Sequence, residues 1–182
     1  MRIHTSLCWM LAAAVCAGEI QAAAPPSPKA PAAAYDMQNP AELAAFKKAI
    51  RAKYDVKEKA FASGDADAIV YGFYAGDEIT VAARDGIFFG SKDILPEYKK
   101  DVGVNHVKID SVRTYVNGNA GWDWADFHVY PQDGKTKPFT FAILFLWSKI
   151  NGEWVCLGDY FDYGSFRAKK LDPRPGETAA TK

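Results

Sequence analysis

The amino-acid sequence predicts an α+β fold, in which a curved antiparallel sheet carries helices on one of its faces. Two observations support this prediction. Residues 40–101 hold helical hydrophobic patterns interrupted by one short hairpin pattern, and residues 106–166 alternate with the period of strands. Three hairpin-type turns, Asn117-Gly118, Asp133-Gly134 and Asn151-Gly152, divide the second region into four long strands. We therefore expect a four-strand meander that follows the helices and a short hairpin.

The first helix is predicted to begin at Asn39-Pro40, because asparagine is a favoured N-cap and proline suits the first helical position. Lys57 occupies one position of the apolar stripe of this helix, so its ammonium group should lie near the core. The other members of the stripe are Leu43, Phe46, Ile50, Tyr54 and Phe61.

Shorter elements follow the first helix. Ser63-Gly64-Asp65 is predicted to end it and to cap a second helix over about residues 66–74. Strands at residues 79–84 and 87–89 flank the turn Asp85-Gly86. Ser91 is expected to cap a third helix that ends near residue 101 and contains Pro96, which limits its regularity.

The composition is that of a globular protein without a strong net charge. Of the 182 residues, 49% are hydrophobic, and 22 basic residues balance 22 acidic ones. This length suits one domain of about 100–150 residues with tails. A neutral chain lacks the basic face that nucleic-acid binding requires, so we expect no nucleic-acid partner.

The N-terminal residues predict export. Arg2 and an apolar run from Leu7 to about Ala17 precede small residues at 22–24, which is the layout of a signal peptide over residues 1–24. The run is too short for a membrane-spanning helix of about 20 residues. We therefore expect a periplasmic or secreted protein with no membrane contact after cleavage. An uncleaved anchor and lipidation at Cys16 are the alternatives.

Two polar, proline-containing segments are expected to flank a folded domain at residues 39–166. Residues 25–38 predict an Ala/Pro-rich linker, and residues 167–182 predict a polar tail. Signal cleavage would leave Cys156 as the only cysteine, which excludes an intramolecular disulfide. Because no Cys/His set has the spacing of metal ligands, we expect no metal and no cofactor.

If each turn has two residues, counting outward from it assigns the residue pairs of neighbouring strands and so the face of the sheet on which each side chain lies. By this assignment, both faces of the long sheet are largely apolar. A sheet with one solvated face should alternate more cleanly, so we expect helices to cover one face and a second subunit to cover the other. The face with the larger aromatic area is the candidate homodimer surface. Its residues are Trp122, Trp124, Phe145, Trp147 and Tyr160. A bulge would change this register.

Several short motifs occur in a characteristic order. They are residues 62–67 between the first two helices, Phe73-Tyr74 and Asp77 before a strand, Gly90 before the third helix, and residues 151–154 before the last strand. Over about residues 45–165 the chain resembles the nuclear transport factor 2-like superfamily, in particular its SnoaL-like and ketosteroid-isomerase-like members. The resemblance implies a cone-shaped sheet closed by three helices around an apolar pocket and commonly dimerised through the sheet.

The catalytic positions of ketosteroid isomerases are not retained. With Gly64-Asp65 as the anchor, the catalytic tyrosine falls near Lys57, the general-base aspartate near Ala83 and the oxyanion acid near Leu146. The histidine of many SnoaL-like members falls near Tyr160. Steroid isomerisation by that constellation is therefore not expected.

The resemblance also implies that the face with Leu146, Leu157, Asp159 and Phe161 looks inward. We expect Lys57 to pair there with Asp159 or Asp123, either as part of a ligand site or as a buried structural ion pair. The candidate pocket residues are Lys57, Asp123, Asp159, Tyr54, Phe127, Phe161 and Tyr163.

Three functions remain open at this point. The first is the binding of a small apolar or amphipathic ligand, with no secure catalytic constellation. The second is a cofactor-independent isomerase, cyclase or dehydratase that uses Asp123 or Asp159 as general base. The third is a purely structural dimeric module, which a cavity filled by side chains would favour.

Overall fold

A computed structural model describes residues 39–168 and 170–171 of the chain. The predicted signal peptide and linker lie outside the described residues, as does most of the predicted tail. In the part that is described, no helix is long and apolar enough to cross a membrane.

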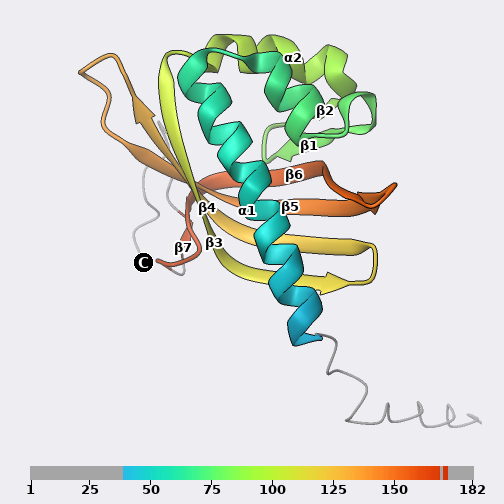
Figure 1. The fold of residues 1–182 in the computed structure, drawn as a ribbon. Coiled ribbons are helices and arrows are strands. Elements are labelled where there is room, and N and C mark those ends of the chain that lie inside the picture. The colour runs from blue at the N-terminus through green and yellow to red at the C-terminus, as the bar shows by residue number, and fades with distance from the viewer. Residues whose placement is uncertain (1–38, 169, 172–182) are drawn as a thin grey trace, which may run out of the picture. The chain divides into compact units, whose positions relative to one another are not determined.

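Helix α1, Pro40–Ser63, lies across one face of the sheet (Figure 1). Its N-terminus forms as predicted, because the Asn39 side chain accepts hydrogen bonds from the backbone N–H groups of Ala41 and Glu42. Gly64 ends the helix in the left-handed conformation, with φ of 78°. The predicted stripe is the buried face, and Lys57 is buried within it.

Short elements connect α1 to the long strands. In order they are the π-helix η2 (Ala68–Phe73), the 3₁₀ turn η3 (Gly76–Glu78), strands β1 (Thr80–Ala83) and β2 (Gly86–Phe89), and helix α2 (Gly90–Asp101). Most of the predicted second helix is thus a π-helix rather than an α-helix. Phe89, not Ser91, is the N-cap of α2, and its N–H bonds the Asp93 carboxylate at 3.1 Å.

The long strands form the predicted meander. They are β3 (Asn105–Asn117), β4 (Ala120–Pro131), β5 (Phe139–Ile150) and β6 (Glu153–Ser165). The sheet order is β2-β1-β6-β5-β4-β3, and the short β7 (Lys170–Leu171) pairs with the end of β6. The α+β prediction is confirmed, with one correction: β1 pairs with β6 in parallel, so the sheet is mixed.

The turn between β4 and β5 is not the predicted two-residue turn. Val129 pairs with Phe139, so a long loop separates the paired segments. The Asp133 side chain stabilises this loop by accepting hydrogen bonds from the N–H groups of Lys135 and Thr136. The strand register consequently slips by one residue, which turns every side chain of β5 to the other face.

A bulge at Leu157 shifts β6 in the same way. Trp147 pairs with Cys156, whereas Leu146 pairs with Gly158, so Leu157 is the extra residue. Gly158 has a φ of 152°, and a Cβ atom there would lie 1.8 Å from the Thr80 carbonyl oxygen. Glycine is therefore required where β1 approaches the bulge.

These two shifts correct the predicted faces of the sheet. Phe145 and Trp147, predicted on the dimer surface, are 0% and 2% exposed and belong to the core beneath α1. Leu146, predicted to face inward, is 47% exposed on the outer face. Trp122, Trp124 and Tyr160 also lie on the outer face, which is the face that the prediction gave them.

The C-terminal end of the described chain covers part of the outer face. The carboxylate of Asp126 is fully buried there and accepts hydrogen bonds from the Ser165 hydroxyl and the Phe166 N–H. The Phe166 ring packs edge-on against Trp124, with 5.2 Å between the ring centroids. These contacts hold the end of β6 and the residue after it against the outer face of the sheet.

Candidate functional site

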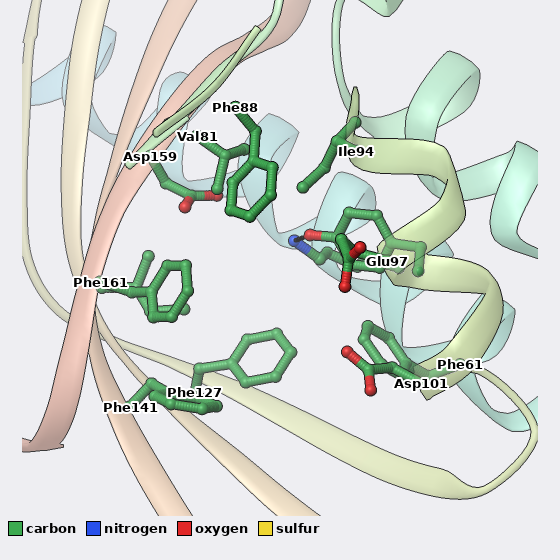
Figure 2. Close-up of a pocket in the computed structure, with 13 residues that line it drawn as sticks. Phe61, Val81, Phe88, Ile94, Glu97, Asp101, Phe127, Phe141, Asp159 and Phe161 are labelled. Atoms are coloured by element: carbon green, nitrogen blue, oxygen red, sulfur yellow. Dashed lines mark hydrogen bonds between the residues drawn. The ribbon is translucent and has the colours of Figure 1, made fainter. Parts of the chain in front are cut away.

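A cavity of about 230 Å³ lies between the sheet and α2 (Figure 2). Helix α2 contributes Ile94, Glu97, Tyr98 and Asp101, and the sheet contributes its aromatic side chains. The remaining lining residues are Lys57, Phe61, Val81, Phe88, Phe127, Phe141, Ile143, Asp159 and Phe161. The walls are therefore apolar and rich in phenylalanine, and the charged side chains are few.

Lys57 reaches this cavity from α1 and is 1% exposed. Its Nζ donates hydrogen bonds to the hydroxyl oxygens of Tyr74 at 2.7 Å and Tyr98 at 2.9 Å. The ammonium also lies 4.4–5.5 Å from the centroids of five aromatic rings, including those of Phe73 and Phe145. Phenol oxygens and ring faces thus replace the water that this cation loses on burial.

Asp159 lies on β6 directly after the bulge and is 5% exposed. Its Oδ2 accepts a short hydrogen bond from the Tyr74 hydroxyl. Tyr74 therefore links the lysine to the carboxylate: its oxygen accepts from Lys57 and its hydrogen goes to Asp159. Among the described residues, none donates a hydrogen bond to Oδ1 of this carboxylate, and Asp159 lines the cavity.

Burial controls the ionisation of this cluster. It lowers the pKa of Lys57 from 10.5 to about 8, although the negative charge of Asp159 acts in the opposite direction. Burial likewise raises the pKa of Asp159, against the effects of Lys57 and the Tyr74 hydrogen bond. The pKa values of Tyr74 and Tyr98 are raised well above 10 by burial and by Asp159, so both phenols stay protonated and can donate.

Asp123, predicted as a pocket residue, belongs to a separate cluster. It is fully buried and is not among the residues that line the cavity. Its carboxylate accepts hydrogen bonds from the hydroxyls of Tyr54, Ser111 and Thr114, each at 2.7 Å. Burial raises the pKa of Asp123, and the three hydroxyls oppose that shift. This carboxylate therefore holds α1 to β3 and β4 rather than facing a ligand.

The remaining predicted pocket residues divide in the same way. Phe127 and Phe161 line the cavity together with Lys57 and Asp159, whereas Tyr54 and Tyr163 do not. Tyr54 packs among core rings, and Tyr163 packs on Phe139 and Phe141 outside the lining. Within the described residues, no group of three or more His, Cys, Asp or Glu side chains could hold a metal ion.

Sequence reasoning missed the two tyrosines that connect Lys57 to Asp159. Tyr98 follows Ile94 by four residues on α2, so the helical spacing placed both on one face. Tyr74 ends the segment in which Val70 and Tyr74 are four residues apart. These spacings could have suggested burial. They could not have shown that both hydroxyls meet the Lys57 amine.

Comparisons with known proteins identify the fold. No protein-family model matches the sequence, and no curated protein matches it. A nuclear transport factor 2-like protein of unknown function from Shewanella oneidensis is 18% identical, with a TM-score of 0.56, over 63% of this chain and 97% of that one. A nuclear transport factor 2-like superfamily protein from Salmonella enterica is 20% identical, with a TM-score of 0.57, over 67% and 93%.

A protein of unknown function from Mycobacterium tuberculosis is similar at a TM-score of 0.61, with 11% identity over 71% of this chain and 78% of that one. The described domain therefore has the nuclear transport factor 2-like fold, which confirms the fold that the resemblance implied. Likeness at this identity concerns the fold, so the function has to be argued from the pocket.

Proposed function

We propose that this domain binds a small, mainly apolar molecule that carries one polar group. The observation that carries this proposal is the cavity of about 230 Å³, which is lined by five phenylalanines and three aliphatic side chains and by a smaller set of polar ones, namely Lys57, Glu97, Tyr98, Asp101 and Asp159. Apolar walls with a few convergent polar groups are typical of small-molecule sites. The cavity is somewhat smaller than the roughly 300–1,000 Å³ of sites for drug-sized ligands, so the expected ligand is smaller than these.

The polar group of the ligand would lie against Asp159. Its Oδ1 can accept a hydrogen bond from a hydroxyl or amine of the ligand, whereas the Tyr98 hydroxyl already donates its hydrogen to the Tyr74 oxygen, 2.9 Å away. An unfilled cavity with a reachable carboxylate also argues against the purely structural alternative, which called for a cavity filled by side chains.

Filling the cavity with a larger side chain should weaken ligand binding. We expect Val81→Phe, which places a ring in the space beside Asp159, to weaken binding of 2-naphthol by at least about tenfold, or 1.4 kcal/mol. 2-Naphthol has an apolar body and one hydroxyl, and isothermal titration calorimetry measures its affinity. Val112→Phe is the matched control and should bind normally, because Val112 is 37% exposed and does not line the cavity. It lies where the pairing of β3 with β4 shifts, between Ser111 and Arg113. Equal affinity in both variants would contradict the proposal.

Catalysis by Asp159 is the second candidate function. A carboxylate that lines an apolar cavity, and whose pKa burial raises, is suited to act as a general base for a cofactor-independent isomerase, cyclase or dehydratase. Asp123 is unsuited to this role because three hydroxyls occupy its carboxylate outside the cavity. Deuterium exchange next to the carbonyl of 2-cyclohexenone tests the idea. Exchange that persists unchanged in Asp159→Asn would exclude it.

We also propose that the domain forms a homodimer through the outer face of the sheet. The corrected surface consists of Trp122, Trp124, Leu146 and Tyr160, of which Leu146 and Tyr160 are 47% and 46% exposed. Leu146→Glu would place a charge in the contact and should shift the mass in light scattering from dimer to monomer. Wild-type protein that is already monomeric at micromolar concentration would contradict this assignment.

We propose that binding takes place outside the cytoplasm, because residues 1–24 have the layout of a signal peptide. N-terminal sequencing of exported protein should return a start between about residues 23 and 26. Exported protein that retains Met1 would overturn this part of the proposal.

A further inference from the structure

We propose that the pocket selects an organic cation, that is, an amine or quaternary ammonium group on a small apolar body. This inference rests on the proposed function, because it specifies the ligand class of the same cavity. Three features of the pocket carry it: the balance of charges in its lining, the availability of one carboxylate oxygen, and the aromatic walls.

The charge balance of the lining is negative. One ammonium, that of Lys57, faces three carboxylates, those of Asp159, Glu97 and Asp101. Lys100, which does not line the cavity, pairs with Glu97 at 2.7 Å; both side chains are exposed, at 67% and 43%, so water screens this pair. The carboxylate whose charge water screens least is that of Asp159, which is 5% exposed. Burial and then the nearby Glu97 raise the pKa of Asp101, and the charge of Lys100 acts in the opposite direction. A bound cation would lie among three carboxylates that line one cavity, and it would stabilise their charged forms.

The lysine is already engaged, whereas one carboxylate oxygen is available. Nζ of Lys57 donates to Tyr74 and Tyr98 and is surrounded by ring faces, so an anionic ligand would have to compete with these contacts. By contrast, Asp159 has only its Oδ2 engaged by a described residue, although the side chain is 5% exposed. Lys57 keeps one N–H group without a hydrogen bond to a described residue, but ring faces surround it, so the Asp159 carboxylate is the less engaged of the two charged groups.

The walls suit a cation as well as an apolar body. Phe61, Phe88, Phe127, Phe141 and Phe161 line the cavity. Figure 2 shows Phe127 and Phe161 on the sheet side, with Phe88 beside Asp159, and Glu97 and Asp101 on the helix side. Aromatic rings attract cations through their negative faces, and they do so best where water is excluded. Rings combined with carboxylates favour ammonium over a neutral group of the same shape.

Three probes of matched size test this inference by calorimetry. Benzyltrimethylammonium is the cation, neopentylbenzene has the same shape without the charge, and phenylacetate is the anion. We expect the cation to bind at least about tenfold more tightly than neopentylbenzene, and phenylacetate to bind most weakly. Asp159→Asn should remove most of this preference while neopentylbenzene affinity stays the same, which also shows that the variant is folded.

If Asp159→Asn does not fold, Asp101→Asn provides the second test, because Asp101 is exposed and its substitution should not disturb folding. Asp101→Asn should reduce the affinity for the cation and leave the affinity for neopentylbenzene unchanged. Added salt should likewise weaken binding of the cation and leave neopentylbenzene unaffected. Neopentylbenzene or phenylacetate binding as tightly as the cation would overturn this inference and leave the proposed function standing. Failure of all three probes and of 2-naphthol would overturn both.

Discussion

Replacing Lys57 by methionine is expected to lower the free energy of unfolding by about 3 kcal/mol at neutral pH. Methionine nearly keeps the volume of the side chain. It leaves the buried carboxylate of Asp159 without a compensating charge, and it removes the donor that Tyr74 and Tyr98 accept from. Denaturant melts measure the loss, and Lys59→Met, on the exposed side of the same helix, should have little effect.

Coupling the change with Asp159→Asn distinguishes a buried charge pair from independent contributions. Because both charges are then removed, the double variant should recover much of the stability that Lys57→Met loses. Strictly additive losses would show that Lys57 and Asp159 do not interact through Tyr74. No loss from Lys57→Met alone would show that the ammonium contributes nothing to the fold.

The same comparison should depend on pH. The folded pKa of Lys57, about 8, lies below its ordinary value of 10.5, so between these values the unfolded chain holds a proton that the folded chain lacks. The penalty for burying the charged amine is therefore fully present below pH 8, and it disappears as the pH rises to 10.5, so the stability of the wild type increases over this range. The difference in stability between wild type and Lys57→Met should grow by roughly 1 kcal/mol per pH unit from pH 8 to 10. A difference that stays constant over this range would contradict the assignment.

Asp123→Ala is expected to destabilise the domain by about 3 kcal/mol without altering ligand affinity. The carboxylate is the common acceptor for three hydroxyls, and the Tyr54 hydroxyl is too deeply buried to bond water instead. An unsatisfied buried donor costs about 1–3 kcal/mol, and a small cavity adds to this cost.

Calorimetry with 2-naphthol supplies the second readout for Asp123→Ala. Affinity measured on the folded fraction should equal that of wild type, because Asp123 does not line the cavity. Asp67→Ala, at an exposed position, is the stability control. Lost affinity with normal stability would place Asp123 in the ligand site after all.

The sequence predicted the elements better than it predicted the contacts between them. Helix α1 could be placed closely because its cap and its apolar stripe are local signals. That Lys57 is buried also followed from the stripe. Its partners could not be predicted, since Tyr74 and Tyr98 come from separate short elements whose positions depend on tertiary packing.

In the sheet, two local irregularities changed the face on which the side chains of β5 and β6 lie. The wide loop after β4 turned β5 over, which moved Phe145 and Trp147 into the core. The bulge at Leu157 then turned the rest of β6 over again, so Asp159 and Phe161 share a face with Asp123, as predicted. Turn type and bulges depend on side-chain hydrogen bonds and close backbone approaches, which strand periodicity does not reveal.

Titrating ¹⁵N-labelled protein with 2-naphthol, while following the backbone amides by NMR, tests whether the cavity beside Asp159 binds a small ligand. We expect chemical-shift changes that concentrate on the residues lining the cavity, among them Phe61, Tyr98 and Phe161, and that are absent in Val81→Phe. Changes confined to the outer face around Leu146 and Tyr160, or no changes at all, would contradict the proposed binding.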